Sequence, residues 1–216
     1  RILCPYLLEA LILIEEGVRI EQIDKALKNI GMPVGPVALL DEVGIDVGVH
    51  VMSGNMNDLI KDRDGIKLNY SMPKMLEAGL SGRKSKKGFY HYVNKKGKVK
   101  KGKVNEGVYQ YFDSPNVKKI SDKEITERCI LILLNEAVWA LEEGIIENVT
   151  DGDIGGVFGI GFLPWSGGPF SYMNQIGISN ILDRMKHYQN LYGNKFQPRP
   201  MLVEMAERNE KFELFT

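Results

Sequence analysis

The sequence predicts a mostly α-helical protein built from two tandem copies of one helical unit, with a small β-hairpin between them. Two observations lead to this prediction. Two long apolar helical segments share one pattern of acidic and glycine residues. A Gly-Pro pair follows each segment and precedes a short helical pattern that ends in glycine. Repetition of this kind is typical of a duplicated structural unit.

The first pair of matching elements is a pair of long helices, predicted over "ILCPYLLEALILIEEG" and "ISDKEITERCILILLNEAVWALEEG". Ile130 to Leu134 of the second segment are apolar on every side, and the first segment is apolar throughout except for Glu9, which is typical of a helix buried all round. Ser121 and Glu124 give the second helix the S-x-x-E pattern of a capping box. Each helix carries a Glu-Ala pair and then Glu-Glu-Gly, and Glu136 follows Glu9 by 136 − 9 = 127 residues.

The second pair of matching elements is a Gly-Pro corner followed by a short helix. Gly35-Pro36 leads to a pattern that ends at Gly44, and Gly168-Pro169 leads to one that ends at Gly177. Proline at the first position of a helix is favourable because its missing N–H needs no partner there. The first copy also predicts a helix over residues 20–30, which glycines replace in the second copy.

Between the copies, "SMPKMLEAGLSG" predicts a short helix, "GFYHYV" a strand or hairpin arm, and residues 94–118 a loop. Two amphipathic helices, "ISNILDRMKHYQNLYG" and "PMLVEMAERN", are predicted near the end of the chain. The resulting division is a first repeat over residues 1–93, a basic linker or loop over 94–120, and a second, degenerate repeat with C-terminal helices over 121–216.

Composition excludes several classes of protein. The 216 residues hold 28 basic and 28 acidic side chains, so no overall field draws the chain to nucleic acid or to an anionic membrane. The longest apolar run, residues 2–14, is shorter than the roughly 20 residues that a membrane span needs. Cys4 and Cys129 form no CxxC motif and are expected to be reduced, buried thiols. Three scattered histidines do not indicate a metal site.

The segment "GDIGGVFGIGFLPWSGGPF", residues 152–170, raises the question of a phosphate-binding loop. A dinucleotide-binding loop needs glycines at i, i+2 and i+5 between a strand and a helix. Gly159 and Gly161 fit, but Pro164 occupies the third position, and no GxGxxG occurs anywhere in the chain. The segment therefore predicts a shaped backbone, because glycine permits close approach and positive φ while proline fixes φ.

Four aromatic residues of this segment supply an apolar wall. They either fill a core or line a pocket for the apolar tail of a substrate, and the sequence leaves both interpretations open; they are Phe158, Phe162, Trp165 and Phe170.

A basic stretch over residues 83–103 holds ten Lys or Arg residues and no acid. Residues 97–103, "GKVKKGK", match the G-x-x-x-x-G-K part of a P-loop, but Val104 stands where a metal-binding Ser or Thr is required, so the match is interpreted as chance. The stretch predicts either a solvated hairpin or a surface for a phosphate-bearing ligand, a nucleic acid or an acidic partner.

Candidate acid–base groups are few. Glu9 and Glu136 lie in apolar helices, where a bare carboxylate is costly and is expected to be paired, so a shared structural role competes with a role as general acid or base. His50, His91 and His187 show no spacing to Ser, Cys or Asp that builds a catalytic triad. The motifs by themselves contain no complete active site.

Three segments give the chain a resemblance to a known family: "RILCPYLLEALILIEEGV…IDKALKNIGMPVGPVALLDEVGIDV", "GRKSKKGFYHY" and "NEAVWALEEGI…GDIGGVFGIGFLPWSGGPF". They are similar to the C-terminal region of L-3-hydroxyacyl-CoA dehydrogenases, and more narrowly to the α-subunits of multifunctional fatty acid oxidation complexes, in which the helical unit is duplicated. The similarity covers nearly the whole chain and is weakest over residues 94–120.

The resemblance implies NAD-dependent oxidation of an L-3-hydroxyacyl-CoA to the 3-ketoacyl-CoA by a longer protein that also has a Rossmann domain and an enoyl-CoA hydratase/isomerase region. It places the catalytic histidine and glutamate, the NAD site and a carbonyl-assisting asparagine ahead of Arg1. No catalytic residue, cofactor or metal is therefore expected in this chain, and by itself the chain should be inactive. The two copies should be related by pseudo-twofold symmetry, which would replace the contact between subunits of a single-function dimer.

The same resemblance implies that this portion closes one side of the acyl-CoA cleft. The residues expected to contact substrate are Met32, Pro33, Val34, Phe158 and Phe162. An alternative is a non-catalytic helical module that docks a thiolase β-subunit. Nucleic acid is not expected as a partner, and membrane association is expected at most for the parent complex. A bacterial cytoplasmic location is favoured, with the mitochondrial matrix as the alternative.

Overall fold

The computed structural model describes residues 1–54, 71–113 and 117–213. They form two compact units, neither of which is continuous in sequence. One unit comprises residues 7–28 and 34–126, and the other comprises residues 1–6, 29–33 and 127–216. We call them the hairpin unit and the corner unit. Within the described residues, no helix combines the length and apolar character needed to cross a membrane.

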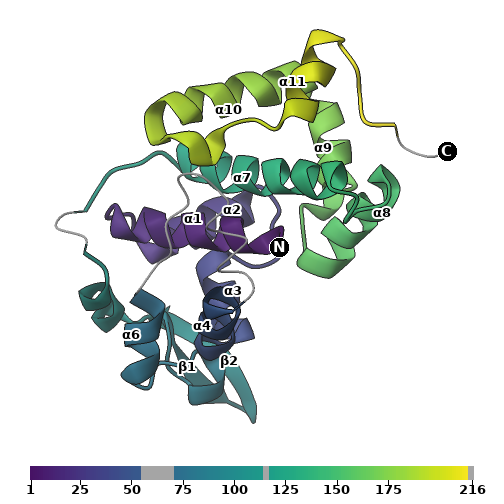
Figure 1. Cartoon of the computed structure of the whole chain (residues 1–216). Helices are drawn as coiled ribbons and strands as arrows, with labels where there is room; N and C mark the ends of the chain where they lie inside the picture. The colour runs from purple at the N-terminus through teal and green to yellow at the C-terminus, as the bar shows by residue number, and fades with distance from the viewer. Residues whose placement is uncertain (55–70, 114–116, 214–216) are drawn as a thin grey trace. The chain divides into compact units, whose positions relative to one another are not determined.

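The first part of the chain is helical, and the helices are α1 (Leu3–Glu15), α2 (Ile20–Asn29), α3 (Pro36–Val43), α4 (Ile45–Ser53) and α6 (Ser71–Glu77) (Figure 1). The sequence predicts each of them except α4. Most of α1 and nearly all of α2 belong to the hairpin unit. Gly17 ends the first long helix with a φ of 94°, and Gly44 separates α3 from α4 with a φ of 105°. These positive φ values explain why both turns require glycine.

After α6 and a 3-10 turn, η1 (Arg83–Ser85), the hairpin unit contains an antiparallel pair of strands, β1 (Tyr90–Lys95) and β2 (Lys98–Val104). Lys95 lies opposite Lys98, so two residues form the connecting turn. These are Lys96 and Gly97, with φ values of 53° and 75°. Two successive positive φ values are typical of the type I′ turn, whose twist matches that of the strands.

The prediction of a loop over residues 94–118 is therefore wrong in its first half. β2 occupies residues 98–104, and a second 3-10 turn, η2 (Glu106–Tyr111), follows it. The lysines concealed the strand because a two-stranded hairpin can leave most of its side chains in water, where charge replaces the expected alternation of apolar and polar residues. Only Val104 of β2 is buried.

Two buried aspartates organise the hairpin unit. Asp24 accepts hydrogen bonds from the N–H groups of Val37 (2.8 Å) and Ala38 (3.0 Å), and so caps the first turn of α3. Asp41, on α3, accepts from the N–H groups of Phe89 (2.9 Å) and Tyr90 (2.8 Å). The Tyr90 hydroxyl donates to Asp24 at 2.6 Å. These contacts connect α2, α3 and the start of the hairpin.

The corner unit is built on the long helix α7 (Asp122–Glu142), of which it contains residues 127–142, and its later elements follow in sequence. They are α8 (Val149–Ile154), a π-helical turn η3 (Gly155–Gly159), η4 (Pro164–Ser166), α9 (Pro169–Ile176), α10 (Ile178–Tyr192), η5 (Asn194–Phe196) and α11 (Pro200–Glu207). Figure 1 shows α10 and α11 side by side. The Ser121 hydroxyl accepts from the Glu124 N–H at 3.1 Å, which confirms the predicted cap of α7.

The expectation that glycines replace a helix in the second copy is also wrong. α8 forms there, and its last turn widens into η3. Asn148 caps α8, because its side-chain oxygen accepts from the Asp151 N–H at 2.9 Å. Glycines weaken a helix by about 1 kcal/mol each, but a cap and burial of neighbouring side chains can offset that cost.

The same corner occurs in both units. Asp153 accepts from the N–H groups of Phe170 (2.7 Å) and Ser171 (3.0 Å), just as Asp24 does at the start of α3. A Cβ atom at Gly35 would lie 2.4 Å from the Asp24 carboxyl carbon, and one at Gly168 would lie 2.4 Å from an Asp153 oxygen. Each glycine therefore makes room for the carboxylate that caps the next helix.

We predict that Asp41 makes the stability of the hairpin unit depend on pH. Burial raises its pKa to about 6, although hydrogen bonds from Phe89 and Tyr90 oppose the shift. A raised pKa contributes stability that is complete below about pH 4, the unfolded value, and is lost as the pH rises to 6. This rise in the pKa of Asp41, from about 4 to about 6, corresponds to a loss of at most about 3 kcal/mol of stability.

The measurement is the free energy of unfolding of Asp41→Asn and of the wild type by urea between pH 4 and pH 7. Asparagine cannot ionise. The free energy of unfolding of Asp41→Asn, measured relative to that of wild type, should therefore increase by roughly 2–3 kcal/mol between pH 4 and pH 7. Any change in stability from the substitution that is the same at every pH does not affect this comparison. The exposed Asp113→Asn serves as control and should change the pH dependence little. A free-energy difference between Asp41→Asn and wild type that stays constant with pH would contradict the prediction.

Candidate functional site

The glycine- and proline-rich segment, residues 152–170, forms the second corner and lies wholly in the corner unit. Its backbone packs closely against the start of α9. A Cβ atom at Gly152 would lie 2.4 Å from the Phe170 ring, and one at Gly156 would lie 2.5 Å from the Pro169 ring. The Phe162 N–H donates to the Gly156 carbonyl at 2.9 Å and closes the turn after η3. The glycines therefore serve close packing, as the sequence predicts.

The two phenylalanines expected at the substrate have opposite environments. Phe162 is fully buried, and its ring meets Tyr172 edge to face at a centroid distance of 5.8 Å. Phe158 lies on the π-helical turn and is 86% exposed. An aromatic ring almost entirely in water is unusual and marks a candidate contact surface. Phe162 lies in the core, whereas Phe158 is free to contact a ligand.

Trp165 links the second corner to the end of α2. Its indole Nε1 donates to the Ile30 carbonyl at 2.8 Å, and a Cβ atom at Gly31 would lie 2.6 Å from the same nitrogen. The other side of the ring faces solvent, since Trp165 is 61% exposed. Gly31 has a φ of 114°, so it supplies both the turn and the space for the indole. The sequence showed an apolar residue here but gave no sign of this hydrogen bond.

The three residues expected at the first corner are consecutive in sequence but differ in burial and in the unit to which they belong. Met32 is buried and Pro33 is exposed, and both belong to the corner unit. A Cβ atom at Gly161 would lie 3.5 Å from the Pro33 ring, so Pro33 borders the second corner. Val34 is exposed and belongs to the hairpin unit. Within the corner unit, the structure thus brings Pro33 and the second corner together.

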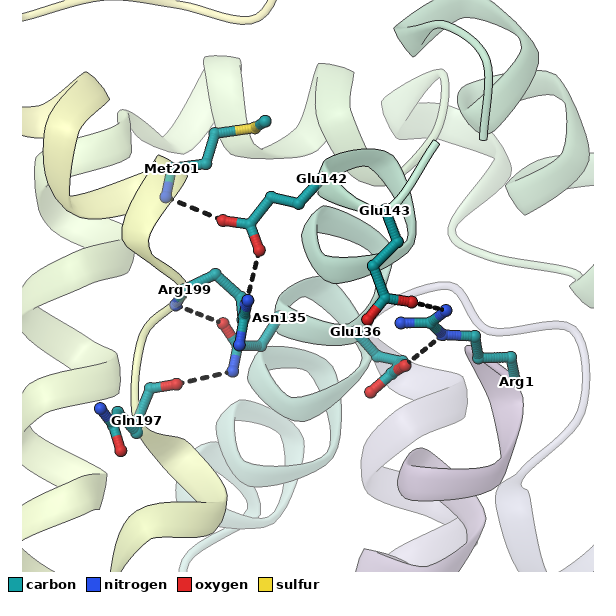
Figure 2. A network of polar contacts seen from close by, with 8 residues as sticks. All are labelled: Arg1, Asn135, Glu136, Glu142, Glu143, Gln197, Arg199 and Met201. Carbon is teal, nitrogen blue, oxygen red and sulfur yellow. Dashed lines mark hydrogen bonds and ion pairs between the residues drawn. The ribbon is translucent and has the colours of Figure 1, made fainter. Parts of the chain in front are cut away.

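Glu136 is buried on α7 and has a specific charged partner. Its carboxylate accepts from Arg1 Nε at 2.6 Å, and Arg1 also donates to Glu143 at 2.5 Å (Figure 2). The two carboxylates raise the pKa of the Arg1 guanidinium although burial opposes that shift. Through this ion pair the Glu136 carboxylate connects α7 to the first residue of the chain. Glu136 therefore has a structural role.

Two other polar side chains of α7, those of Asn135 and Glu142, bind residues 197–201, where α11 begins, as Figure 2 shows. Asn135 donates to the Gln197 carbonyl at 2.8 Å and accepts from the Arg199 N–H at 3.0 Å. Glu142 accepts from Arg199 Nε at 2.6 Å and from the Met201 N–H at 2.9 Å. The Arg199 guanidinium also lies 3.9 Å from the centroid of the Trp139 ring. These partners come from distant parts of the chain, so spacing did not reveal them.

The three candidate histidines lie on three different elements of the structure. His50 is on α4, His91 on β1 and His187 on α10, and within the described ranges none of them bonds to a Ser, Cys or Asp side chain. A search of the same residues finds no cluster of His, Cys, Asp or Glu able to hold a metal ion. Cys4 and Cys129 are free thiols, and burial raises the pKa of Cys4.

The two segments that were compared with nucleotide-binding loops have other geometries in the structure. Gly159 and Gly161 lie at the end of a π-helical turn rather than between a strand and a helix. The partial P-loop match over residues 97–103 lies in the hairpin, mostly in β2, and no α-helix begins after it. Neither residues 159–161 nor residues 97–103 lead directly into the N-terminus of an α-helix, which is the arrangement that binds phosphate in nucleotide sites.

Comparison with known proteins identifies relatives of this chain. Residues 1–92 match the family described as 3-hydroxyacyl-CoA dehydrogenase, C-terminal domain. Over 215 residues the chain is 47% identical to the fatty acid oxidation complex subunit alpha of Shewanella frigidimarina, covering 98% of this chain and 29% of that protein. The chain thus spans less than a third of the length of this relative. The sequence resemblance is confirmed.

Two solved structures share the fold. The crystal structure of 3-hydroxybutyryl-CoA dehydrogenase from Escherichia coli matches with a TM-score of 0.75 and 21% identity, over 97% of this chain and 59% of that one. The dehydrogenase part of multifunctional enzyme 1 from Caenorhabditis elegans matches with a TM-score of 0.64 and 21% identity, over 92% of this chain and 45% of that one.

Two adjacent glycines of the second corner provide a test of its packing. Gly156→Ala should destabilise the protein by about 1–3 kcal/mol, because its Cβ would overlap the rigid Pro169 ring. Gly155→Ala should be neutral or slightly stabilising, because nothing lies within 4 Å and its φ of −61° suits alanine. Urea denaturation of the two variants measures the difference. Equal stabilities would show that the corner is not closely packed.

Proposed function

Because residues 1–92 carry the C-terminal domain of the 3-hydroxyacyl-CoA dehydrogenase family, we propose that this chain is the substrate-binding portion of a longer fatty acid β-oxidation enzyme. That enzyme would oxidise an L-3-hydroxyacyl-CoA to the 3-ketoacyl-CoA with NAD. The observation that carries the proposal is the 47% identity to a fatty acid oxidation complex subunit alpha over nearly the whole chain.

In this proposal the chemistry takes place mainly on other parts of the longer protein. A Rossmann domain would hold NAD and the catalytic histidine and glutamate, and a hydratase/isomerase region would belong to the same protein. The described residues support this division, since Glu136 is held by Arg1 and the described histidines bond to no Ser, Cys or Asp side chain. By itself the chain should neither bind NAD nor turn over substrate.

The proposed contribution of this chain is an apolar surface for the acyl tail. Phe158 is the strongest candidate, because burial of an exposed aromatic ring by a ligand gains roughly 1.5–3 kcal/mol. Pro33 and Val34 are exposed and could extend the contact, whereas Met32 and Phe162 are buried and would act by shaping the backbone. The glycines of η3 hold the Phe158 ring away from the core.

We also propose that the two repeats pair about a pseudo-twofold axis, in place of the two subunits of a simpler dimer. Their division at residues 1–93 and 121–216 belongs to this proposal. The recurrence of one aspartate-capped corner in each repeat supports it. Arg1 and Arg128 also occupy the same position relative to Glu9 and Glu136, at the offset of 127 residues. A bacterial cytoplasmic location is proposed for the parent, with the mitochondrial matrix as the alternative.

A test of substrate binding is the kinetics of Phe158→Ala in the full-length enzyme. KM for a sixteen-carbon L-3-hydroxyacyl-CoA should rise roughly tenfold, because the tail loses an apolar contact, and kcat should change little. KM for the four-carbon substrate should stay the same. Leu191→Ala, which removes another exposed apolar side chain of the corner unit, should leave both values unchanged. Equal KM values for Phe158→Ala and wild type would exclude Phe158 from the acyl site.

A second candidate function is docking of a thiolase β-subunit, favoured by the exposure of Ile154 (53%) and Trp165 (61%) beside Phe158 in sequence. Aromatic residues often carry most of the energy of protein interfaces. If this is their role, the wild-type enzyme should retain thiolase on an affinity column, and Phe158→Ala should retain much less while KM for long substrates is unchanged. Retention by both proteins alike would reject this candidate.

A further inference from the structure

The tip of the hairpin is a strongly basic surface. Lys95, Lys96, Lys98 and Lys100 are all exposed and line an open hollow of about 490 Å³. We call these four residues the lysine tip. Because alternate residues of a strand point to one face, Lys98 and Lys100 share a face of β2, and Lys95 lies opposite Lys98 on β1.

Basic residues nearer the base of the hairpin have partners. Arg83 pairs with Glu42 at 2.5 Å, Lys84 pairs with Asp46, and the Lys101 ammonium lies 4.0 Å from the centroid of the Tyr90 ring. The described part of the chain offers no carboxylate within ion-pair distance of the lysine tip. Among the described residues, the positive charge at the tip therefore has no acidic partner, although the whole chain has no net charge.

The arrangement of the lysine tip is unfavourable without a ligand. Like charges placed directly opposite on neighbouring strands repel, and Lys95 and Lys98 are such a pair. Lys96 occupies a left-handed position, where Asn or Gly is preferred. The hairpin would be more stable with neutral side chains at these positions. A bound polyanion would turn the repulsion into attraction, since all four ammonium groups would face opposite charge.

The side chains of the lysine tip and of the neighbouring hairpin residues indicate which kind of anion would bind there. Ammonium groups are compact point charges that suit phosphate, whereas planar recognition of carboxylates is typical of arginine. The tyrosines of the hairpin, Tyr90 and Tyr92, are buried, so they offer no platform for stacked bases. Val93 is the one large apolar side chain of the hairpin with considerable exposure, too little to enter a bilayer.

We infer that the lysine tip is a binding site for a soluble ligand with clustered phosphate groups, such as a pyrophosphate. The inference does not depend on the proposed dehydrogenase function, because it rests only on the hairpin. The site differs from a P-loop, because side-chain ammonium groups rather than backbone N–H groups contact the phosphates. Binding should weaken steeply as salt is added, since the charges are exposed.

The test is calorimetric titration of the intact protein with sodium pyrophosphate at low ionic strength. The triple variant Lys95→Gln, Lys98→Gln, Lys100→Gln removes three charges of the tip. The matched control, Lys25→Gln, Lys28→Gln, Lys74→Gln, removes three exposed charges from α2 and α6. Wild type and control should bind with Kd values within twofold of each other, and the tip variant should lose that binding at least tenfold.

Thermal unfolding gives a second readout. Pyrophosphate should raise the Tm of wild type and control but not that of the tip variant, whose Tm without ligand should equal or exceed the wild-type value. No pyrophosphate binding by wild type, or equal binding by the tip variant, would overturn the inference. So would tip-dependent binding only to phosphatidylglycerol vesicles or to a single-stranded oligonucleotide, because the partner would then be a membrane or a nucleic acid.

Discussion

The fold depends on one interaction that occurs twice: a buried aspartate that caps the helix after a Gly-Pro corner. Asp24 and Asp153 each place their oxygens on two backbone N–H groups at the start of the next helix. An unpaired buried carboxylate is costly, but several backbone hydrogen bonds offset that cost and fix the direction of the helix. A side chain at Gly35 or Gly168 would occupy the space of the carboxylate, so aspartate and glycine are required together.

Each cap has a consequence for its own unit. In the hairpin unit, Asp24 also accepts from the Tyr90 hydroxyl, so the cap of α3 and the first strand share one carboxylate. In the corner unit, the cap of α9 holds the glycine-rich turn against Pro169, which leaves Phe158 in solvent while Phe162 lies in the core. Two glutamates of α7 are likewise held by arginines from other parts of the chain: Glu136 by Arg1, and Glu142 by Arg199.

Two surfaces remain that the internal structure does not explain, and they differ in chemistry. Phe158 is an apolar side chain whose exposure costs stability, so a contact with an acyl tail or a protein partner would recover free energy. The lysine tip carries charges that repel one another across the hairpin and would gain from a phosphate group. Both surfaces lie at turns, η3 and the Lys96-Gly97 turn, where the backbone can present side chains without disturbing a core.

The sequence by itself determined the helical class, the two long buried helices, the paired Gly-Pro corners and the resemblance to 3-hydroxyacyl-CoA dehydrogenases. The structural features follow from the sequence because apolar periodicity, caps and glycine positions act within a few residues. It did not reveal β2, since lysines in a solvated strand hide the alternation that marks strands, nor α8, where the cap of Asn148 and packing outweigh the glycines. Only the tertiary structure separated Phe158 from Phe162 and joined Trp165 to Ile30 and Arg1 to Glu136. The last two contacts each join residues that lie 135 apart in sequence, and pairing over such distances is decided by packing rather than by local pattern.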